Sequence, residues 1–213
     1  MKKAFLIAVP IIAAFGIVAF FVLKPRSYVP PNKIICIDAG HGGEDAGAVL
    51  DKRYEKDDNL RIALKIADEL KALGFEPFLT RDDDSFVELH TRCDLCNEKN
   101  CSYFVSLHRN SADIDASGTE VWISAAMPEP DKALAAQILK NLEKVGISKN
   151  RGLKWGTNVS ALGEYTVNKY TDCPSCIVEL GFISSAEDNA LFDENLDKYA
   201  KAIAEAIAVQ YGL

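Results

Sequence analysis

The side chains best suited to catalysis are two histidines and two glutamates in separate parts of the chain. His41 stands in the glycine loop "AGHGGEDAG", directly after the apolar run "IICI". His108 ends a second apolar run, "YFVSLH", and Glu179 lies inside a third, "CIVELGF". Glu55 occurs in "RYEKDDNL", just before a long amphipathic segment. Two histidines with a carboxylate are typical of catalytic zinc sites, where three protein ligands leave the fourth position for water.

The residues alone leave the roles of the two glutamates open. One would complete the ligand set, and the other would act as a base toward water. A loop residue such as Glu55 reaches a metal near His41 easily, whereas a strand holds Glu179 rigidly, as a base requires. Simpler interpretations exist, because a strand-end histidine is often only hydrogen-bonded and Glu55 suits a helix N-terminus. Glu179 is the hardest to explain structurally, since burying an unpaired carboxylate costs free energy or raises its pKa.

Two other features of the loops and helices are assigned no catalytic role. The glycine loop does not follow the G-x-G-x-x-G pattern, and Glu44 and Asp45 would repel a pyrophosphate. Nucleotide binding is therefore disfavoured. His90 falls in the middle of an expected helix and is interpreted as structural.

Helical and strand patterns alternate along the chain, which predicts an α/β three-layer sandwich with helices on both faces of a mostly parallel sheet. Ser85 and Glu88 form a capping-box pattern at the start of one helix. Pro77 places its strand at an edge or a bulge. Ligand sites in such folds form at the carboxyl ends of the strands, so His41 and His108 are expected to meet there. The expected strands are 34–37, 75–80, 103–108, 119–124 and 176–182, and the helices are 57–73, 85–98, 131–145 and 195–211.

The N-terminal segment is unlike the rest of the chain. Residues 4–23, "AFLIAVPIIAAFGIVAFFVL", carry no charge and as a helix would span about 30 Å, the thickness of a bilayer core. The segment is longer than a signal-peptide core and lacks a small-x-small cleavage site, which favours a membrane anchor. We expect an anchor or signal in 1–26, a linker in 27–32 and a catalytic domain in 33–213. The charge bias predicts a domain outside the cytoplasm that stays on the membrane, or is secreted if the segment is cleaved.

Charge and size restrict the partners of this domain. The chain of 213 residues has 24 basic and 31 acidic residues, a formal net charge of −7. Four of the basic residues flank the apolar segment, so the remaining domain is more acidic still. Such a surface repels nucleic acid and anionic lipid, which excludes a nucleic-acid partner. The length fits one domain, and we expect a monomer.

The six cysteines give a weaker signal. Cys93 and Cys96, and likewise Cys173 and Cys176, have the C-x-x-C spacing of structural zinc sites. The two pairs are too far apart in the sequence for a zinc ribbon. We therefore interpret most of the cysteines as small buried apolar residues, with one disulfide or redox-sensitive pair as the alternative.

Five ordered blocks resemble the zinc-dependent N-acetylmuramoyl-L-alanine amidases of the amidase-3 type. The blocks are "IDAGHGGEDAGAV", "EKDDNLRIALKIADELKALGFEPFLTRDDDSFVELHTRCDLCN", "FVSLHRNSA", "GTEVWIS" and "CIVELGFISSAEDNALF". The resemblance covers the chain from about Lys33 to its C-terminus and implies a mixed six-stranded sheet. It also implies peptidoglycan as the substrate, with cleavage of the amide between N-acetylmuramic acid and L-alanine of the stem peptide, and hence a domain that faces the cell wall.

The resemblance also implies a role for each of the four residues. His41, Glu55 and His108 correspond to the ligands of Zn²⁺, and Glu179 corresponds to the glutamate base that acts on a zinc-bound water. Some relatives carry a helical insertion that blocks the zinc, but only about a dozen residues, "AAMPEPDKALAA", separate "GTEVWIS" from the next helix here. An open site is therefore expected. Two alternatives are a zinc peptidase that acts on stem peptides and a non-catalytic wall-binding scaffold.

Overall fold

A six-stranded sheet forms the centre of the protein in a computed structural model that describes residues 28–112 and 115–213. The strand order is β4-β1-β5-β8-β6-β7, and β6 runs antiparallel to β8 while the other neighbours are parallel. This confirms the mixed, mostly parallel sheet, and Pro77 lies in the edge strand as expected. The strands are β1 (Ile34–Ala39), β4 (Glu76–Leu79), β5 (Tyr103–Asn110), β6 (Thr119–Ile123), β7 (Asn150–Trp155) and β8 (Ser175–Phe182).

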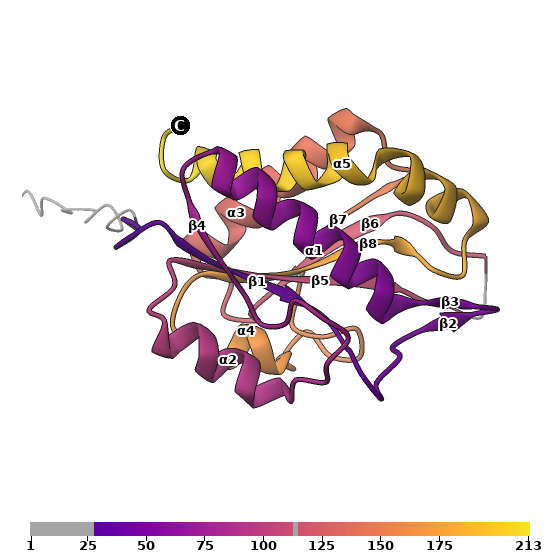
Figure 1. Cartoon of the computed structure of the whole chain (residues 1–213), viewed down its shortest axis with the longest axis horizontal. Coiled ribbons are helices and arrows are strands. Elements are labelled where there is room, and N and C mark those ends of the chain that lie inside the picture. Colours follow the sequence, from indigo (N-terminus) through magenta and orange to yellow (C-terminus); the bar gives the residue numbers. More distant parts are fainter. Residues whose placement is uncertain (1–27, 113–114) are drawn as a thin grey trace, which may run out of the picture.

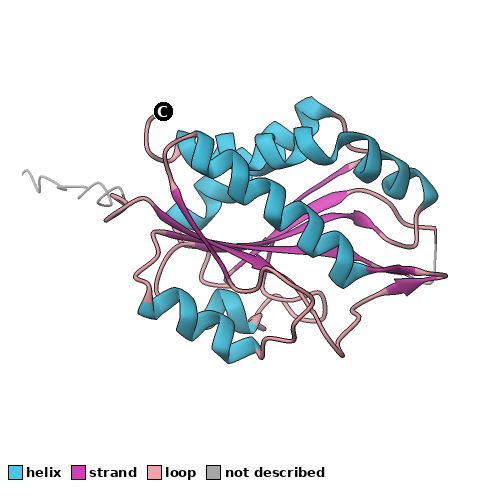
Figure 2. Cartoon of the chain, viewed as in Figure 1, coloured by secondary structure: helices cyan, strands magenta, loops and turns pink. Residues whose placement is uncertain are grey.

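Helices cover both faces of the sheet, which gives the three layers seen in Figures 1 and 2. One face carries α1 (Glu55–Ala72), α3 (Glu129–Val145) and α5 (Ala186–Val209). The opposite face carries the shorter α2 (Leu89–Glu98) and α4 (Thr166–Tyr170). A small antiparallel hairpin, β2 (Val49–Leu50) and β3 (Arg53–Tyr54), precedes α1.

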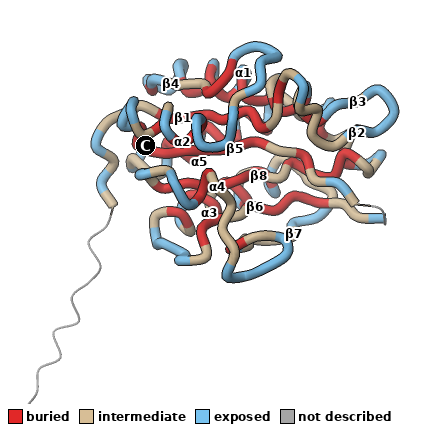
Figure 3. The backbone as a smooth tube through the Cα atoms, turned by 90° about the horizontal axis from the view of Figure 1, so that it is seen from below, coloured by how far each residue is buried: buried red, intermediate tan, exposed pale blue. Residues whose placement is uncertain are grey.

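Two apolar clusters hold the layers together, and the pleat of the strands divides residues between them. Ile35 and Ile37 of β1 face the larger cluster under α1, α3 and α5, whereas Cys36 faces the smaller cluster under α2 and α4. Buried backbone accordingly follows the strands and the inner sides of the helices in Figure 3. In α1 the buried residues Ile62, Ile66 and Leu70 recur at helical spacing and pack against the sheet.

Two expected helix boundaries are wrong. The helix expected from Ser85 begins at Leu89, and its N-cap is Glu88, whose side chain accepts a hydrogen bond from the His90 backbone N–H at 2.8 Å. The closing helix begins at Ala186 rather than Asn195. The first turn of this helix is polar, and the Asp188 carboxylate in it is buried and accepts the Phe182 N–H at 2.7 Å.

The hairpin, β7 and α4 were not expected from the sequence, because each is short or lacks a clear apolar period. The expected anchor in residues 4–23 lies outside the described residues. Within 28–112 and 115–213, no helix is both long and apolar enough to cross a membrane.

Candidate metal centre

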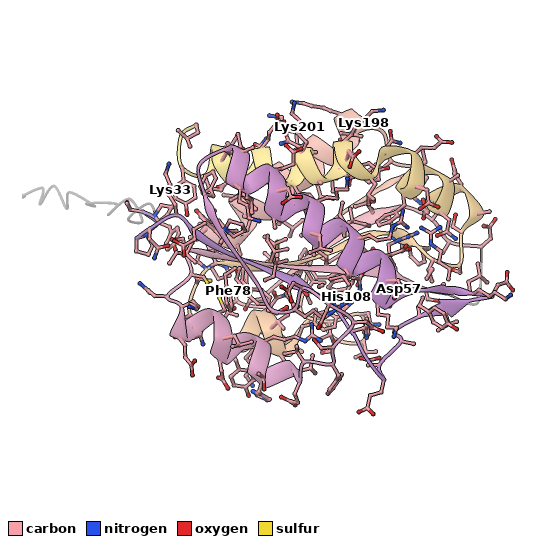
Figure 4. All side chains as sticks on the ribbon, viewed as in Figure 1. Lys33, Asp57, Phe78, His108, Lys198 and Lys201 are labelled. Atoms are coloured by element: carbon pink, nitrogen blue, oxygen red, sulfur yellow. The ribbon has the colours of Figure 1, made fainter. Side chains whose placement is uncertain are left out.

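The four predicted residues meet at the carboxyl ends of β1, β5 and β8. His41 follows β1, His108 lies near the end of β5, and Glu179 lies opposite His108 in the register of β8. Glu55 is the first residue of α1, whose N-terminus reaches the same edge of the sheet. Figure 4 shows His108 beside this end of α1, where Asp57 is labelled.

Three of these side chains converge on one point. Glu55 Oε1 lies 2.8 Å from His108 Nδ1 and 3.2 Å from His41 Nε2. One ligand atom of each of the three residues lies within 4.8 Å of the others. Two imidazoles and one carboxylate are a donor set of catalytic zinc, so the residues present fit this metal.

The backbone around His41 is shaped to present its ring. His41 has a φ of 61°, a left-handed conformation that non-glycine residues seldom adopt and that often marks functional sites. His41 Nδ1 lies 2.7 Å from Asp45 Oδ2, which leaves Nε2 facing Glu55. Two glycines in this loop lie too close to the histidines to carry a side chain. A Cβ on Gly40 would lie 2.3 Å from the His108 ring, and a Cβ on Gly47 would lie 2.6 Å from His41 Cδ2.

Two buried arginines that the sequence analysis did not single out fix the loop that carries His41. Arg92 of α2 donates to the carbonyl oxygens of Ala39 and His41, at 2.8 and 2.9 Å. Arg81, just after β4, donates to the carbonyl oxygens of Ala39 and Gly40, at 2.8 and 3.0 Å. Because guanidinium groups donate in a rigid plane, these contacts hold the backbone on either side of His41 in one position.

Asp38 is the carboxylate that balances this positive charge. It is fully buried and accepts hydrogen bonds from Thr80 Oγ1, Ser106 Oγ and Arg92 Nη1 at 2.6–2.7 Å. Burial alone would raise the pKa of Asp38, but Arg92 and the two hydroxyls outweigh it and lower that pKa below its ordinary value. Asp38 is therefore a positioning residue for the loop, not a metal ligand.

The three converging residues change one another's protonation. Burial would raise the pKa of Glu55, yet the bonds to His108 and His41 hold it far below its ordinary value. Burial would lower the pKa of His108, but Glu55 raises it to about 9. Glu55 is thus a carboxylate throughout the neutral range. A metal must compete with protons for the imidazoles, so its binding weakens as pH falls.

Glu179 stands apart from this group and has a different environment. Its Oε2 atom is buried and has no hydrogen-bond partner among the described residues. Burial raises the pKa of Glu179 from 4.5 to about 7; His108 opposes this shift, while Glu55 and Glu120 add to it. A carboxylate with a pKa near neutrality and a free oxygen is suited to accept and return a proton.

A cleft with a volume of about 490 Å³ adjoins these residues, and Glu55 lies behind the two histidines that it contacts. His41, His108 and Glu179 line the cleft directly, and apolar side chains of Phe86, Leu89, Val167 and Ile177 form much of its wall. The connection between β6 and α3 is only the short stretch 124–128, so the expected absence of a blocking insertion there is confirmed. The cleft can admit an extended substrate.

Asp45→Asn is expected to weaken metal binding by about 10–100-fold, as loss of a partner that orients a ligating histidine typically does. The change removes the carboxylate that fixes His41 Nδ1, while the amide oxygen can still accept the Gly47 N–H at 3.1 Å. Zinc affinity is measured by competition with a chelator. The control is Glu44→Gln, which removes a charge from an exposed neighbour in the same loop. Equal affinities of the two variants would contradict an orienting role for Asp45.

Comparisons with known proteins agree with this geometry. Residues 35–209 match the family Amidase_3, described as N-acetylmuramoyl-L-alanine amidase. The chain is 37% identical over 183 residues to the uncharacterized protein YqiI of Bacillus subtilis, covering 84% of this chain and 85% of YqiI. It is 32% identical to the N-acetylmuramoyl-L-alanine amidase LytC of the same organism, covering 84% of this chain and 36% of LytC.

Solved structures show the same fold. The catalytic domain of CwlV, an N-acetylmuramoyl-L-alanine amidase from Bacillus (Paenibacillus) polymyxa, gives a TM-score of 0.74 at 35% identity, with 83% of this chain and 97% of that one covered. The CwlD amidase from Clostridioides difficile gives a TM-score of 0.77 at 29% identity, with 85% and 99% covered.

Proposed function

The chain belongs to the N-acetylmuramoyl-L-alanine amidase family and is an amidase that acts on peptidoglycan, and we propose that its reaction depends on zinc held by His41, Glu55 and His108. The observation that carries this proposal is the convergence of these three side chains beside the unpartnered Oε2 of Glu179. When bound, zinc makes a water molecule acidic near neutral pH and polarises the carbonyl that is attacked.

Glu179 is proposed as the general base and then the general acid. Its Oε2 takes the proton from the attacking water, and the same atom gives it to the nitrogen of L-alanine as the amide bond breaks. Strand β8 holds the carboxylate in place between buried neighbours on both sides, Val178 and Leu180. Its raised pKa favours retention of the proton between the two steps.

The apolar wall of the cleft supports the choice of substrate bond. A cleft of this size encloses the lactyl and alanyl groups on either side of the amide while the rest of the glycan and stem peptide stays outside. Contact of a bound substrate with Val167 and Ile177 would displace water from the reacting carbonyl and so strengthen the electrostatic interactions there.

The proposal is tested on the purified full-length chain, loaded with zinc and incubated with purified peptidoglycan. New N-terminal residues are identified with and without a chelator. The expected result is chelator-sensitive release of N-terminal L-alanine. New termini of other residues would identify a peptidase instead, and no release by the zinc-loaded protein would favour a non-catalytic scaffold.

The pH profile of kcat/KM is expected to fall on the acid side as Glu179 becomes protonated. The base must be ionised, so activity is present above its pKa and is lost as pH falls through it. Burial sets that pKa to about 7 in the metal-free protein, against an ordinary 4.5. A bound cation favours the carboxylate, so the acid limb should lie between these two values.

Loss of zinc from protonated histidines would also lower activity at acid pH. A single substitution distinguishes that effect from the titration of Glu179. Glu120 lies opposite Glu179 in the neighbouring strand, and its negative charge raises the pKa of Glu179. Glu120→Gln should therefore move the acid limb to lower pH at saturating zinc. An unchanged limb would assign the titration to another group.

A further inference from the structure

Four cysteines from separate segments gather on the α2 and α4 face of the sheet. We call Cys36 of β1, Cys96 of α2, Cys101 before β5 and Cys173 before β8 the thiol cluster. The sulfur atoms of Cys36, Cys96 and Cys101 all lie within 4.8 Å of one another, and all three residues are buried. Cys173 is half-buried, and its Sγ lies 3.7 Å from Cys96 Sγ.

The thiol cluster is separate from the zinc centre. Cys101 and Cys173 precede the amino ends of β5 and β8, whereas the histidines and Glu179 lie toward the carboxyl ends of the strands. Phe78 packs against the same apolar cluster as these cysteines, and Figure 4 shows it well apart from His108 along the sheet. A ligand of the thiol cluster would therefore not touch the catalytic residues.

The arrangement differs from a single disulfide pair. Cys96 approaches three other sulfurs, those of Cys36, Cys101 and Cys173. A disulfide joins two sulfurs about 2.05 Å apart, and all six cysteines, which lie among the described residues, are unpaired. Four thiolates around a tetrahedral zinc, each about 2.3 Å from it, lie roughly 3.8 Å from one another. The Cys96–Cys173 separation of 3.7 Å matches this second arrangement. Cys173 is not one of the three residues whose sulfurs all lie within 4.8 Å of one another, so its side chain must turn toward Cys36 and Cys101 to become the fourth ligand.

We propose that the thiol cluster is a structural site for a thiophilic divalent cation, Zn²⁺, separate from the catalytic zinc. Four protein ligands would close the coordination sphere, which is the pattern of structural rather than catalytic zinc. The cation would tie β1, the end of α2 and the loop before β8 together. Each ligating thiol gives its proton to solvent on binding, so binding is favoured at higher pH.

The surroundings provide access and partial charge compensation. A second cavity of about 320 Å³ is lined by Cys96, Cys101 and Cys173, and also by Tyr28, Val29 and Pro31 of the segment before β1. A cation can reach three of the four sulfurs from this side. A hydrogen bond with Cys36 and the charge of Lys99 favour the thiolate form of Cys101, although contact with Cys96 and burial outweigh them and raise the pKa of Cys101 to about 12.

The structure also shows where the two C-x-x-C pairs of the sequence lie. Each C-x-x-C pair contributes only one residue to the thiol cluster, Cys96 from the first and Cys173 from the second. Cys93 points elsewhere, with its Sγ 3.4 Å from the Leu89 carbonyl and 3.7 Å from that of Thr166. Cys176 belongs to the apolar cluster on the opposite face of the sheet.

Cobalt binding tests the proposal on the reduced, metal-free, full-length chain. Two Co²⁺ ions per chain are expected, with sulfur-to-cobalt charge-transfer absorption in the near ultraviolet that a site of imidazole and carboxylate lacks. His108→Ala should retain this absorption and lose the other ion. Cys96→Ser should lose the absorption, bind one ion and keep amidase activity. Cys93→Ser, one turn earlier in α2, is the matched control and should keep both ions.

A measurement on the unsubstituted chain guards against misfolding of the variants. Zn²⁺ should slow alkylation of Cys173, the half-buried thiol, as judged by mass analysis of its peptide. Unchanged alkylation of Cys173, or a single Co²⁺ without charge-transfer absorption, would overturn the proposal. A Cys96–Cys173 disulfide in protein isolated without reductant, with no metal beyond the histidine site, would overturn it too.

Discussion

Glu179→Gln is expected to lower kcat by about 10²–10⁴-fold, the range that general acid–base catalysis contributes, while zinc binding is retained. Glutamine has the shape of glutamate but cannot take a proton from water at neutral pH. Oε2 of Glu179 makes no hydrogen bond among the described residues, so the substitution breaks no contact that supports the fold. Removal of a buried acid should leave stability equal or slightly higher.

The measurement is the steady-state rate of N-terminal alanine release, together with the zinc content of the same preparation. Glu120→Gln, assayed at its own pH optimum, is the matched control. Glu120 is a buried carboxylate in the adjacent strand, but its oxygens are occupied by Asn110, Trp122 and Arg151. It should keep most of the rate. A Glu179→Gln variant with normal kcat and normal zinc content would show that the base is another group.

The centre of the fold and the four site residues could be predicted from the sequence because their signals are local. The apolar runs that contain Ile35, Val105 and Val178 are short, which favours buried strands over helices, and buried parallel strands place their carboxyl ends at one edge. That edge is where His41 and His108 meet. The residues around Glu55 and Glu179 did not show which glutamate is the ligand and which is the base. That assignment came from the family resemblance. The structure brings Glu55 to the histidines and leaves Glu179 unpartnered.

The supporting network could not be predicted in the same way. Asp38, Arg81 and Arg92 act on backbone carbonyls and on one another, and such contacts depend on the tertiary arrangement of β1, β4 and α2. One signal was available for Arg92. It lies next to Cys93 and four residues before Cys96, two buried residues of α2, so a charged group falls on the inner side of the helix. An arginine in that position must have buried acceptors.

The thiol cluster shows why sequence spacing can mislead about tertiary contacts. C-x-x-C spacing places two sulfurs near one another only when the local backbone turns back. Cys93 and Cys96 lie within a regular helix, and Cys176 lies inside a strand that points its side chain to the other face of the sheet. Contact between Cys36 and Cys96 depends instead on how α2 packs on β1.

His108→Ala is expected to abolish both zinc binding at the catalytic centre and amidase activity. The substitution removes one of three ligands, so the loss of affinity should exceed the roughly 10–100-fold that follows removal of an outer hydrogen-bond partner. Glu55 Oε1 would keep contacts with the Arg109 backbone N–H and His41 but lose the 2.8 Å contact with His108. Because His108 helps to lower the pKa of Glu55, that pKa should rise toward its ordinary value.

Zinc content after dialysis and the rate of alanine release are measured together, and His90→Ala is the matched control. His90 is exposed in the first turn of α2 and packs against the Tyr170 ring, with ring centroids 4.8 Å apart, away from the three ligands. It should keep both zinc and activity. Folding of His108→Ala is checked by its thermal transition, since a folded variant without the catalytic zinc is the result that the ligand assignment requires. A folded variant that still holds the catalytic zinc and cleaves at the normal rate would remove His108 from the ligand set.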